Sequence, residues 1–381
     1  MNRRVFIASA AGGLAALAQG QEVPASIQAL KPMTDGIQPI TDGERQGRIE
    51  KARQLMRRHR IDAILMESGS SLFYYTGKRE ITGVWILPFK GEPAWVEPEY
   101  KAMAQVLADR GASRIGIEER VRFAVYDGLR KEAAAKEFTS ADPVTVGCRV
   151  IKSQAEIVLM QRANDITIAA YKAALATLKE GMTQRDLSAN IAAAYRALGV
   201  SGSAMAIFDK YTAFPHGSIQ PQQLREGDMV LIDDGCSVEG YQSDITRTTV
   251  FGRPTARQRQ VWDQERKAQN AALAAAKPGA TCESVDAAAR RVITDAGYGP
   301  GYQVPGLPHR TGHGIGLDGH EWTYLVKGNK TKMEPGMCFS NEPTIAIYGE
   351  FGVRLEDCMY ITESGARMFT RQSPAIDQPF G

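Results

Sequence analysis

The segment LPHRTGHGIGLDGHE, residues 307–321, contains three of the five histidines of this 381-residue chain, His309, His313 and His320. Imidazole groups transfer protons near neutral pH and bind transition metals, so a cluster of them indicates a reactive site. Alternating glycines at 312–316 disfavour a helix and let the backbone pass close to a metal or a substrate. We therefore expect the three side chains to project from an extended segment.

An internal repeat places a second set of reactive residues in register with this segment. LKEGMTQRDLSANIAAAYRALG (178–199) aligns with AKPGATCESVDAAARRVITDAG (276–297), and each copy follows an alanine-rich helical segment. Further along the chain PHGS aligns with GHGI, GDMVLID with PGMCFSNE, and GYQSD with GVRLE. Each half therefore supplies one histidine and then two carboxylates: His216, Asp233 and Asp244 in the first half, and His313, Glu342 and Glu356 in the second.

The carboxylates end or lie within short apolar runs that are typical of strands, namely MVLID, SDITRTTV, MCFSNE and GVRLED. Side chains alternate faces along a strand, so Asp244, Thr246 and Thr248 share one face, as do Arg354 and Glu356. If the two halves pack about a pseudo-twofold axis, four carboxylates point into one space. Carboxylates buried together must take up protons or cations, and two divalent cations would neutralise all four.

The set of donor atoms also indicates which metal ions would bind and which reaction they would support. Oxygen-rich ligation with a single imidazole suits hard or borderline divalent ions, so we expect manganese first, with cobalt, zinc or iron as alternatives. Two metals bridged by carboxylates would hold a water between them and lower its pKa. Hydrolysis is the reaction that such a centre favours.

The elements around these residues divide the chain into four predicted segments. Residues 1–18 contain paired arginines before a short apolar run and resemble a twin-arginine export signal, which predicts an exported, periplasmic or secreted protein. Residues 19–43 lack periodicity and are expected to form a linker. Residues 44–148 alternate helical and strand patterns, with strands expected at IDAILM, GVWILPF, AWVEP and RIGIE, and predict a compact α/β domain. Residues 149–381 hold the repeat and predict an α+β domain.

Composition excludes several classes of protein. The 46 basic and 43 acidic residues give a net charge of +3, which is too balanced for a nucleic-acid-binding surface. The apolar run near the N-terminus is too short to span a bilayer, so no integral membrane span is expected. The five cysteines show no CxxC spacing, which argues against a thiolate metal site or a disulfide framework. We expect most of them to be buried as small apolar side chains.

The motifs PHRTGHGIGLDGHE, LIDDG, GYQSDITRT, NEPTI and GVRLED together resemble those of the pita-bread metallopeptidases, specifically aminopeptidase P and Xaa-Pro dipeptidase (prolidase). The resemblance covers essentially the whole chain after the signal. It implies a fold of the α+β class: a pita-bread catalytic domain with an internal pseudo-twofold repeat, preceded by a smaller α/β domain of the creatinase/prolidase N-terminal kind. It also implies that such chains associate, so a homo-oligomer, dimer or tetramer, is expected.

The same resemblance assigns roles to individual residues. It implies that Asp233 binds one metal, that His313 and Glu342 bind the other, and that Asp244 and Glu356 bridge the two. His216, His309 and His320 match histidines that hold substrate and move protons, Arg354 matches an arginine beside the bridging glutamate, and Glu342 matches the usual general base. Asp234 departs from the family pattern, which has an apolar or aromatic residue at that position.

The expected function is dinuclear-metal-dependent hydrolysis of the Xaa-Pro bond, at the N-terminus of peptides or in dipeptides. The preference for proline-containing peptides comes from the resemblance alone. In this mechanism a hydroxide between the metals attacks the carbonyl before proline, and a histidine assists departure of the proline nitrogen. Two alternatives use the same scaffold: a metal-free hydrolase like creatinase, and a non-catalytic peptide-binding module. The complete set of five ligands argues against both.

Overall fold

The computed structural model of the protein describes residues 22–380. The predicted export signal at 1–18 therefore lies outside the described residues. Within the described part of the chain, none of the helices combines the length and the apolar character needed to cross a membrane.

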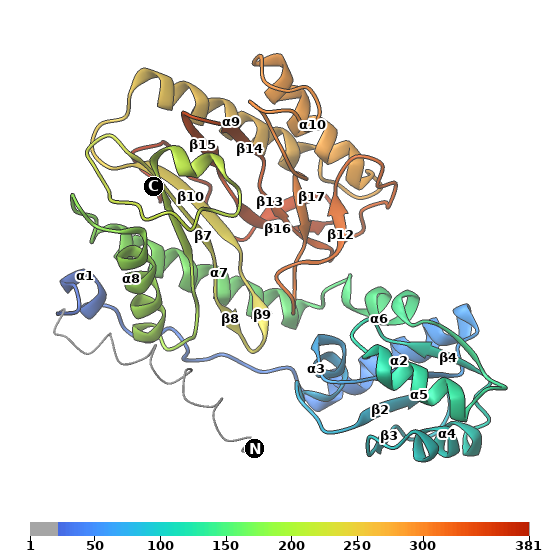
Figure 1. Cartoon of the computed structure of the whole chain (residues 1–381). Helices are drawn as coiled ribbons and strands as arrows, with labels where there is room; N and C mark the ends of the chain where they lie inside the picture. The colour runs from blue at the N-terminus through green and yellow to red at the C-terminus, as the bar shows by residue number, and fades with distance from the viewer. Residues whose placement is uncertain (1–21, 381) are drawn as a thin grey trace, which may run out of the picture.

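The N-terminal domain is a five-stranded mixed sheet with helices packed around it (Figure 1). The strand order is β3-β2-β1-β4-β5, in which β1, β4 and β5 run parallel and β2 and β3 are antiparallel to their neighbours. Its elements are α2 (Asp42–His59), β1 (Ala63–Met66), α3 (Ser70–Thr76), β2 (Val84–Pro88), β3 (Ala94–Val96), α4 (Tyr100–Asp109), β4 (Arg114–Ile117), α5 (Phe123–Glu132), β5 (Glu137–Ser140) and α6 (Asp142–Arg149). All four strands expected from the sequence are present.

The segment before α2 falls within the predicted linker. It contains a short helix, α1 (Ala25–Gln28), and packs on the catalytic domain. Ile27 and Ile40 are buried, and the Met33 N–H donates to the Leu198 carbonyl at 2.9 Å. The sequence predicts a linker at 19–43 because its few apolar residues form no periodic pattern, and the structure adds that α1 contacts the helices at 154–175 and 184–197.

Four helices of the catalytic domain follow the predicted repeat. The long helices α7 (Gln154–Leu175) and α9 (Ala256–Ala275) each precede a shorter one, α8 (Gln184–Ala197) and α10 (Cys282–Asp295), and each short helix lies against the long helix of its own half (Figure 1). Three of the four begin with a reciprocal capping interaction, such as Thr183 with Asp186 in α8. The two aligned sequence segments are α8 and α10 with their flanking turns.

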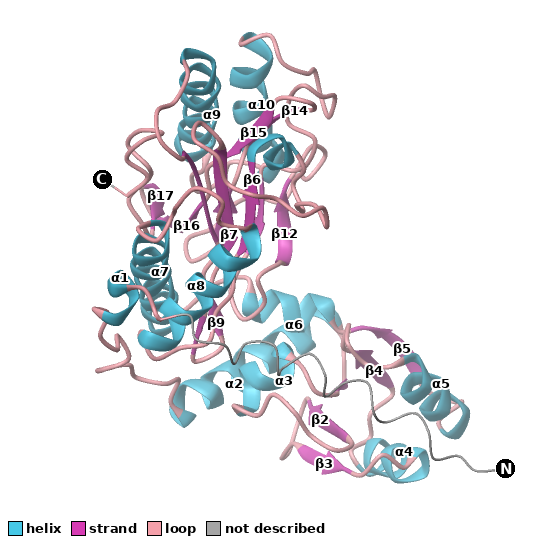
Figure 2. Cartoon of the chain, turned by 60° about the vertical axis from the view of Figure 1, so that its left-hand side comes forward, coloured by secondary structure: helices cyan, strands magenta, loops and turns pink. Residues whose placement is uncertain are grey.

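The strands of both halves lie between these helices (Figure 2). The first half contributes β6 (Met205–Phe208), a 3-10 turn η2 (Asp209–Ala213), β7 (Met229–Asp234), the hairpin β8 (Ser237–Val238) and β9 (Tyr241–Gln242), and β10 (Ile245–Val250). The second contributes β11 (Gly312–Gly314), β12 (Glu321–Leu325), β13 (Cys338–Asn341), the hairpin β14 (Thr344–Ile347) and β15 (Phe351–Arg354), β16 (Asp357–Thr362) and β17 (Gly365–Met368). The sheet orders are β10-β7-β6 and β12-β11-β13-β16-β17.

The two halves are joined where β10 runs beside the junction of β15 and β16. The Glu356 N–H donates to the Thr246 carbonyl at 3.1 Å, and the Thr248 hydroxyl donates to the Arg354 carbonyl at 2.6 Å. These contacts hold the carboxylate-bearing segments of the two halves side by side. All five cysteines are buried and unpaired, as expected.

Candidate metal centre

A cavity of about 140 Å³ lies where the strand ends of the two halves meet. All nine residues to which the sequence assigned a role line it, together with two others; the lining residues are Pro215, His216, Asp233, Asp244, His309, Arg310, His313, His320, Glu342, Arg354 and Glu356. The carboxylates come from strand ends: Asp233 from the end of β7, Asp244 from just before β10, Glu342 from just after β13, and Glu356 from between β15 and β16. The site is therefore built equally from both halves.

His313 is held as a neutral imidazole. Its Nδ1 is 3.0 Å from the Gly314 carbonyl oxygen, which can only accept a hydrogen bond, so Nδ1 carries the proton and the Nε2 lone pair faces the cavity. Burial lowers the pKa of His313 well below its ordinary value, so the ring stays uncharged. Nε2 lies 3.2 Å from Glu342 Oε1 and 3.6 Å from Asp244 Oδ2.

The candidate ligand atoms form three overlapping groups, each within 4.8 Å of one another: Asp233 with Asp244 and Glu356, His313 with Glu342 and Glu356, and Asp244 with His313 and His320. Glu356, Asp244 and His313 each belong to two of these groups, but only the two carboxylates have two oxygen atoms to offer, whereas a neutral imidazole has one free nitrogen. Residues that reach both sides are the ones able to bridge two ions.

The carboxylates of the cavity would be stabilised in their charged forms by bound cations. Burial, together with the neighbouring carboxylates, raises the pKa of Asp244 and Glu356 well above the ordinary range and that of Glu342 to about 7. Among the described residues Glu356 Oε1 is buried without any hydrogen-bond partner. A buried acceptor left open beside a free imidazole nitrogen and three further carboxylates fits a pair of divalent cations, which would neutralise the four acids.

Thr246 and Arg354 link the acids of the two halves. The Thr246 hydroxyl lies 2.7 Å from both Asp233 Oδ1 and Glu356 Oε2. Arg354 Nε donates to that hydroxyl at 3.0 Å, Nη1 donates to the Pro215 carbonyl at 3.0 Å, and Nη2 donates to Asp233. Arg354 thus fixes both a candidate ligand and the loop that carries His216.

The three other histidines of the cavity differ in their exposure and in the hydrogen bonds that their ring nitrogens make. Both ring nitrogens of His309 are engaged, Nδ1 with the Arg310 carbonyl at 2.7 Å and Nε2 with the Thr344 hydroxyl at 3.0 Å, and burial lowers its pKa to about 3. His320 is exposed, with Nδ1 accepting from Arg310 at 3.1 Å, so Nε2 carries its proton. His216 is also exposed. His216 and His320 are therefore better placed than His309 to exchange protons with a substrate.

The two adjacent aspartates at the end of β7 point in different directions. Asp233 lines the cavity, whereas the Asp234 carboxylate accepts hydrogen bonds from the Ser203 hydroxyl at 2.8 Å and from the Gly235 N–H at 2.9 Å. The departure from the family pattern at 234 therefore leaves the position of Asp233 intact.

Three contributing residues received no role from the sequence. Arg310 lines the cavity and holds His320, Thr344 holds His309, and Ser340 donates to Glu342 Oε1 at 3.2 Å while accepting from the His313 N–H at 3.0 Å. Arg310 lies inside the histidine-rich motif and Thr344 inside NEPTI. The motifs could therefore have drawn attention to both residues, but their contacts could not be predicted from the sequence.

Comparison with known proteins identifies the family of the chain. The model of metallopeptidase family M24 matches residues 158–363, which is more than half of the chain, and the creatinase/prolidase N-terminal domain matches 48–102. The chain belongs to metallopeptidase family M24. It is thus an enzyme, and the family resemblance carried by its motifs is confirmed.

Relatives of this M24 peptidase extend over nearly the whole chain. It is 32% identical over 348 residues to an Xaa-Pro dipeptidase from Pyrococcus horikoshii, covering 85% of this chain and 97% of that protein. Among solved structures, dipeptidase PepE from Mycobacterium ulcerans superposes with a TM-score of 0.80 at 28% identity, covering 88% and 97% of the two chains. An Xaa-Pro dipeptidase from Bacillus anthracis gives 0.79 at 27% identity, covering 88% and 99%. The predicted pita-bread fold with a smaller N-terminal domain is confirmed.

Proposed function

We propose that this M24 metallopeptidase hydrolyses the peptide bond that precedes proline, with two divalent cations in the cavity between its halves. The observation that carries the proposal is the overlap of two ligand groups at Glu356, in a cavity lined by every residue that the motifs predicted. The proline preference is supported by relatives named Xaa-Pro dipeptidase, which align over nearly their full length.

The residues divide into ligands and groups that act on the substrate. Asp233 would bind one cation, His313 and Glu342 the other, and Asp244 and Glu356 both. Bound cations would lower the pKa of a water held between them and offset the negative charge that develops on the substrate carbonyl oxygen.

The surrounding side chains would handle protons and orientation. Glu342 is the proposed general base, because its carboxylate faces the cavity beside the other candidate ligands. His320 offers an Nε2–H, since Arg310 occupies its Nδ1, and is suited to donate toward the departing proline nitrogen. His216 is a second proton carrier at the exposed side. His309, whose nitrogens are both occupied, would hold the shape of the cavity, and Arg354 would orient Asp233.

Two other functions use this scaffold, and the unpartnered Glu356 Oε1 argues against both. A metal-free hydrolase of the creatinase kind would need its buried acids satisfied by protein groups, and a binding module would not need five ligands in one place. Elemental analysis of the metal content of purified protein distinguishes a metal-free hydrolase from the proposed dinuclear enzyme.

Manganese is the proposed physiological ion, with cobalt, zinc or iron as substitutes, because the donor set is mostly carboxylate.

We propose further that the protein is exported through its N-terminal segment and acts as a homo-oligomer. Cleavage of dipeptides and of longer peptides are both included in the proposal.

The test is a product assay on stripped protein with manganese, cobalt or zinc restored. Xaa-Pro and Xaa-Pro-Yaa peptides are expected to release the residue before proline, and matched peptides with alanine in place of proline are expected to be cleaved far more slowly. Equal cleavage of both series would contradict the proline preference. Full activity in protein that contains no metal by elemental analysis would contradict the dinuclear centre.

A further inference from the structure

His320 is carried by an irregular connection between β11 and β12. Residues 315–320 belong to neither strand, and the ring of His320 is exposed and packs on that of His313, with centroids 3.9 Å apart and ring planes tilted by 41°. Backbone hydrogen bonds hold the start of this connection, from the Ile315 N–H to the Cys338 carbonyl and from the Gln242 N–H to the Gly316 carbonyl, but among the described residues none joins residues 317–320 to a strand. Its shape must therefore be fixed by other contacts if His320 is to keep its place over the metal cavity.

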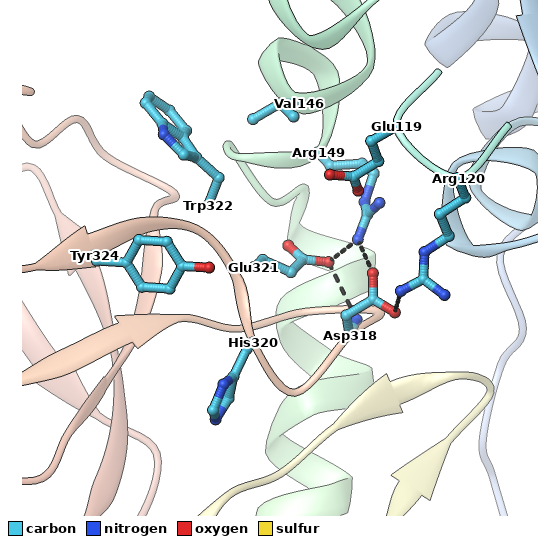
Figure 3. Close-up of a pocket in the computed structure, with 9 residues that line it drawn as sticks. All are labelled: Glu119, Arg120, Val146, Arg149, Asp318, His320, Glu321, Trp322 and Tyr324. Carbon is cyan, nitrogen blue, oxygen red and sulfur yellow. Dashed lines mark hydrogen bonds and ion pairs between the residues drawn. The ribbon is translucent and has the colours of Figure 1, made fainter. Parts of the chain in front are cut away.

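Glu321 supplies one set of these contacts by reaching back to the connection. Its Oε1 accepts from the Leu317 N–H at 2.9 Å and from the Asp318 N–H at 3.2 Å. The same carboxylate accepts from Arg149 Nη2 at 2.5 Å (Figure 3). It also accepts from Lys152 Nζ at 2.9 Å. Burial alone would raise the pKa of Glu321, but Lys152 and Arg149 lower it to about 2, so the carboxylate remains charged.

Asp318 supplies the second set and ties the connection to the N-terminal domain. Its carboxylate accepts from Ser70 at the start of α3 at 2.6 Å, from Arg120 at 3.0 Å and from Arg149 at the end of α6 at 2.6 Å. Figure 3 shows Arg149 between the Glu321 and Asp318 carboxylates. One buried guanidinium thus holds both ends of the segment 318–321.

This ionic cluster lies beside a second recess of about 370 Å³, which borders the metal cavity. His320 lines both spaces, and the exposed Trp322 lines the recess with Tyr324. A displacement of the connection would move His320 relative to the candidate ligands, since the hydrogen bond from Arg310 holds the ring on one side.

We propose that Glu321, held by ion pairs with Arg149 and Lys152, is a positioning residue for His320. Because Arg149 and Asp318 link the connection to the N-terminal domain, the position of His320 would also depend on how that domain packs on the rest of the chain. The proposal rests on the proposed function, in which His320 serves the departing amine. It assigns no direct contact between Glu321 and the substrate.

A double-mutant cycle in the full-length, manganese-loaded enzyme tests it on an Xaa-Pro dipeptide. Glu321→Gln keeps the shape of the side chain and removes its charge; kcat is expected to fall about 10- to 100-fold with little change in KM. In a His320→Ala background, Glu321→Gln is expected to change kcat by no more than about twofold, because its effect passes through the missing imidazole. Two metals per chain are expected in every variant.

Glu67→Gln is the matched control, because Glu67 is also a buried carboxylate that accepts from a guanidinium and a backbone N–H, both of Arg122 in the N-terminal domain. It is expected to retain the kcat of the unmodified enzyme. Arg149→Lys keeps the charge but replaces the planar guanidinium, whose Nη2 contacts both Glu321 and Asp318, with a shorter ammonium side chain; its kcat is expected to lie between those of the unmodified enzyme and Glu321→Gln. If Glu321→Gln does not fold, Asp318→Asn enters the same cycle.

Three outcomes overturn the inference: unchanged kcat in Glu321→Gln, an equally large loss in the His320→Ala background, or loss of metal in Glu321→Gln. A second readout does not depend on activity. In the metal-free protein the imidazole NMR signals of His320 are expected to shift in Glu321→Gln and to stay in place in Glu67→Gln; unshifted signals contradict the proposal. An unmodified enzyme that cleaves no Xaa-Pro peptide would refute the proposed function, while the NMR experiment still tests the position of His320.

Discussion

The two halves of the catalytic domain offer the same residue types at equivalent positions but in different surroundings. His216 of the first half is exposed, whereas His313 of the second is 1% exposed and has its tautomer fixed by Gly314. The acids follow the same trend, since the side chains of Asp233 and Asp244 are 20% and 17% exposed and that of Glu356 is 2% exposed. A repeat therefore places equivalent residues, and burial then distinguishes His313, the proposed metal ligand, from His216, which is proposed to act on the substrate.

The strongest test of the shared centre is Asp244→Ala, which removes a residue that belongs to two ligand groups. Activity is expected to fall at least about a thousandfold, equivalent to about 4 kcal/mol of transition-state stabilisation. Elemental analysis is expected to find fewer than two metals per chain. Retained turnover of an Xaa-Pro substrate would show that the first half contributes no bridging ligand.

The contrast between the histidines is tested by comparing His313→Ala with His216→Ala. His313→Ala is expected to lose metal as well as activity, because it removes the imidazole ligand. His216→Ala is expected to keep both metals and lose about 100-fold in kcat, the scale of one general acid or base. Equal metal loss in both variants would contradict the distinction drawn from their burial.

The buried acids predict how the stability of the metal-free protein depends on pH. The pKa of Glu342 is raised to about 7 by burial, so the folded state holds a proton that the unfolded state has released between about pH 4.3 and 7. Stability contributed by this group is complete below that window and is lost as the pH rises through it.

The melting temperature of the metal-free protein is therefore expected to fall relative to that of Glu342→Gln over this range, and added manganese should raise it more at pH 7 than at pH 5. Differential scanning calorimetry at several pH values provides the measurement. Parallel curves for the two proteins would contradict the assignment.

The smallest expected effect comes from Asp234→Asn. The side chain keeps its size and points away from the cavity; its amide oxygen can accept from the Gly235 N–H while its amide nitrogen donates to the Ser203 hydroxyl. We therefore expect kcat to change by less than about threefold and stability by about 0.5 kcal/mol or less. Asp233→Asn is the paired variant, and it should weaken metal binding. A metal deficit in Asp234→Asn would transfer the ligand assignment to the neighbouring aspartate.

Much of the site could be predicted because its residues follow local patterns. Asp233 ends an apolar strand, Glu342 follows another, and their repeat mates stand at matching distances, so one alignment of the chain with itself identified both sets. The docking of α1 could not be predicted, because Ile27 is buried only by helices more than a hundred residues away. The same holds for Ser70 and Asp318, which are 248 positions apart.

The sequence by itself determined which residues are reactive, that they come in two matched sets, and that strands carry them, because strand periodicity and the repeat are local properties of the chain. Only the tertiary structure decided which imidazole nitrogen is free, that Glu356 keeps an open buried oxygen, that Asp234 turns away from Asp233, and that a guanidinium at the end of α6 holds the turn before β12. These depend on burial and on hydrogen bonds between distant segments, which exist only once the two halves and the N-terminal domain have packed together.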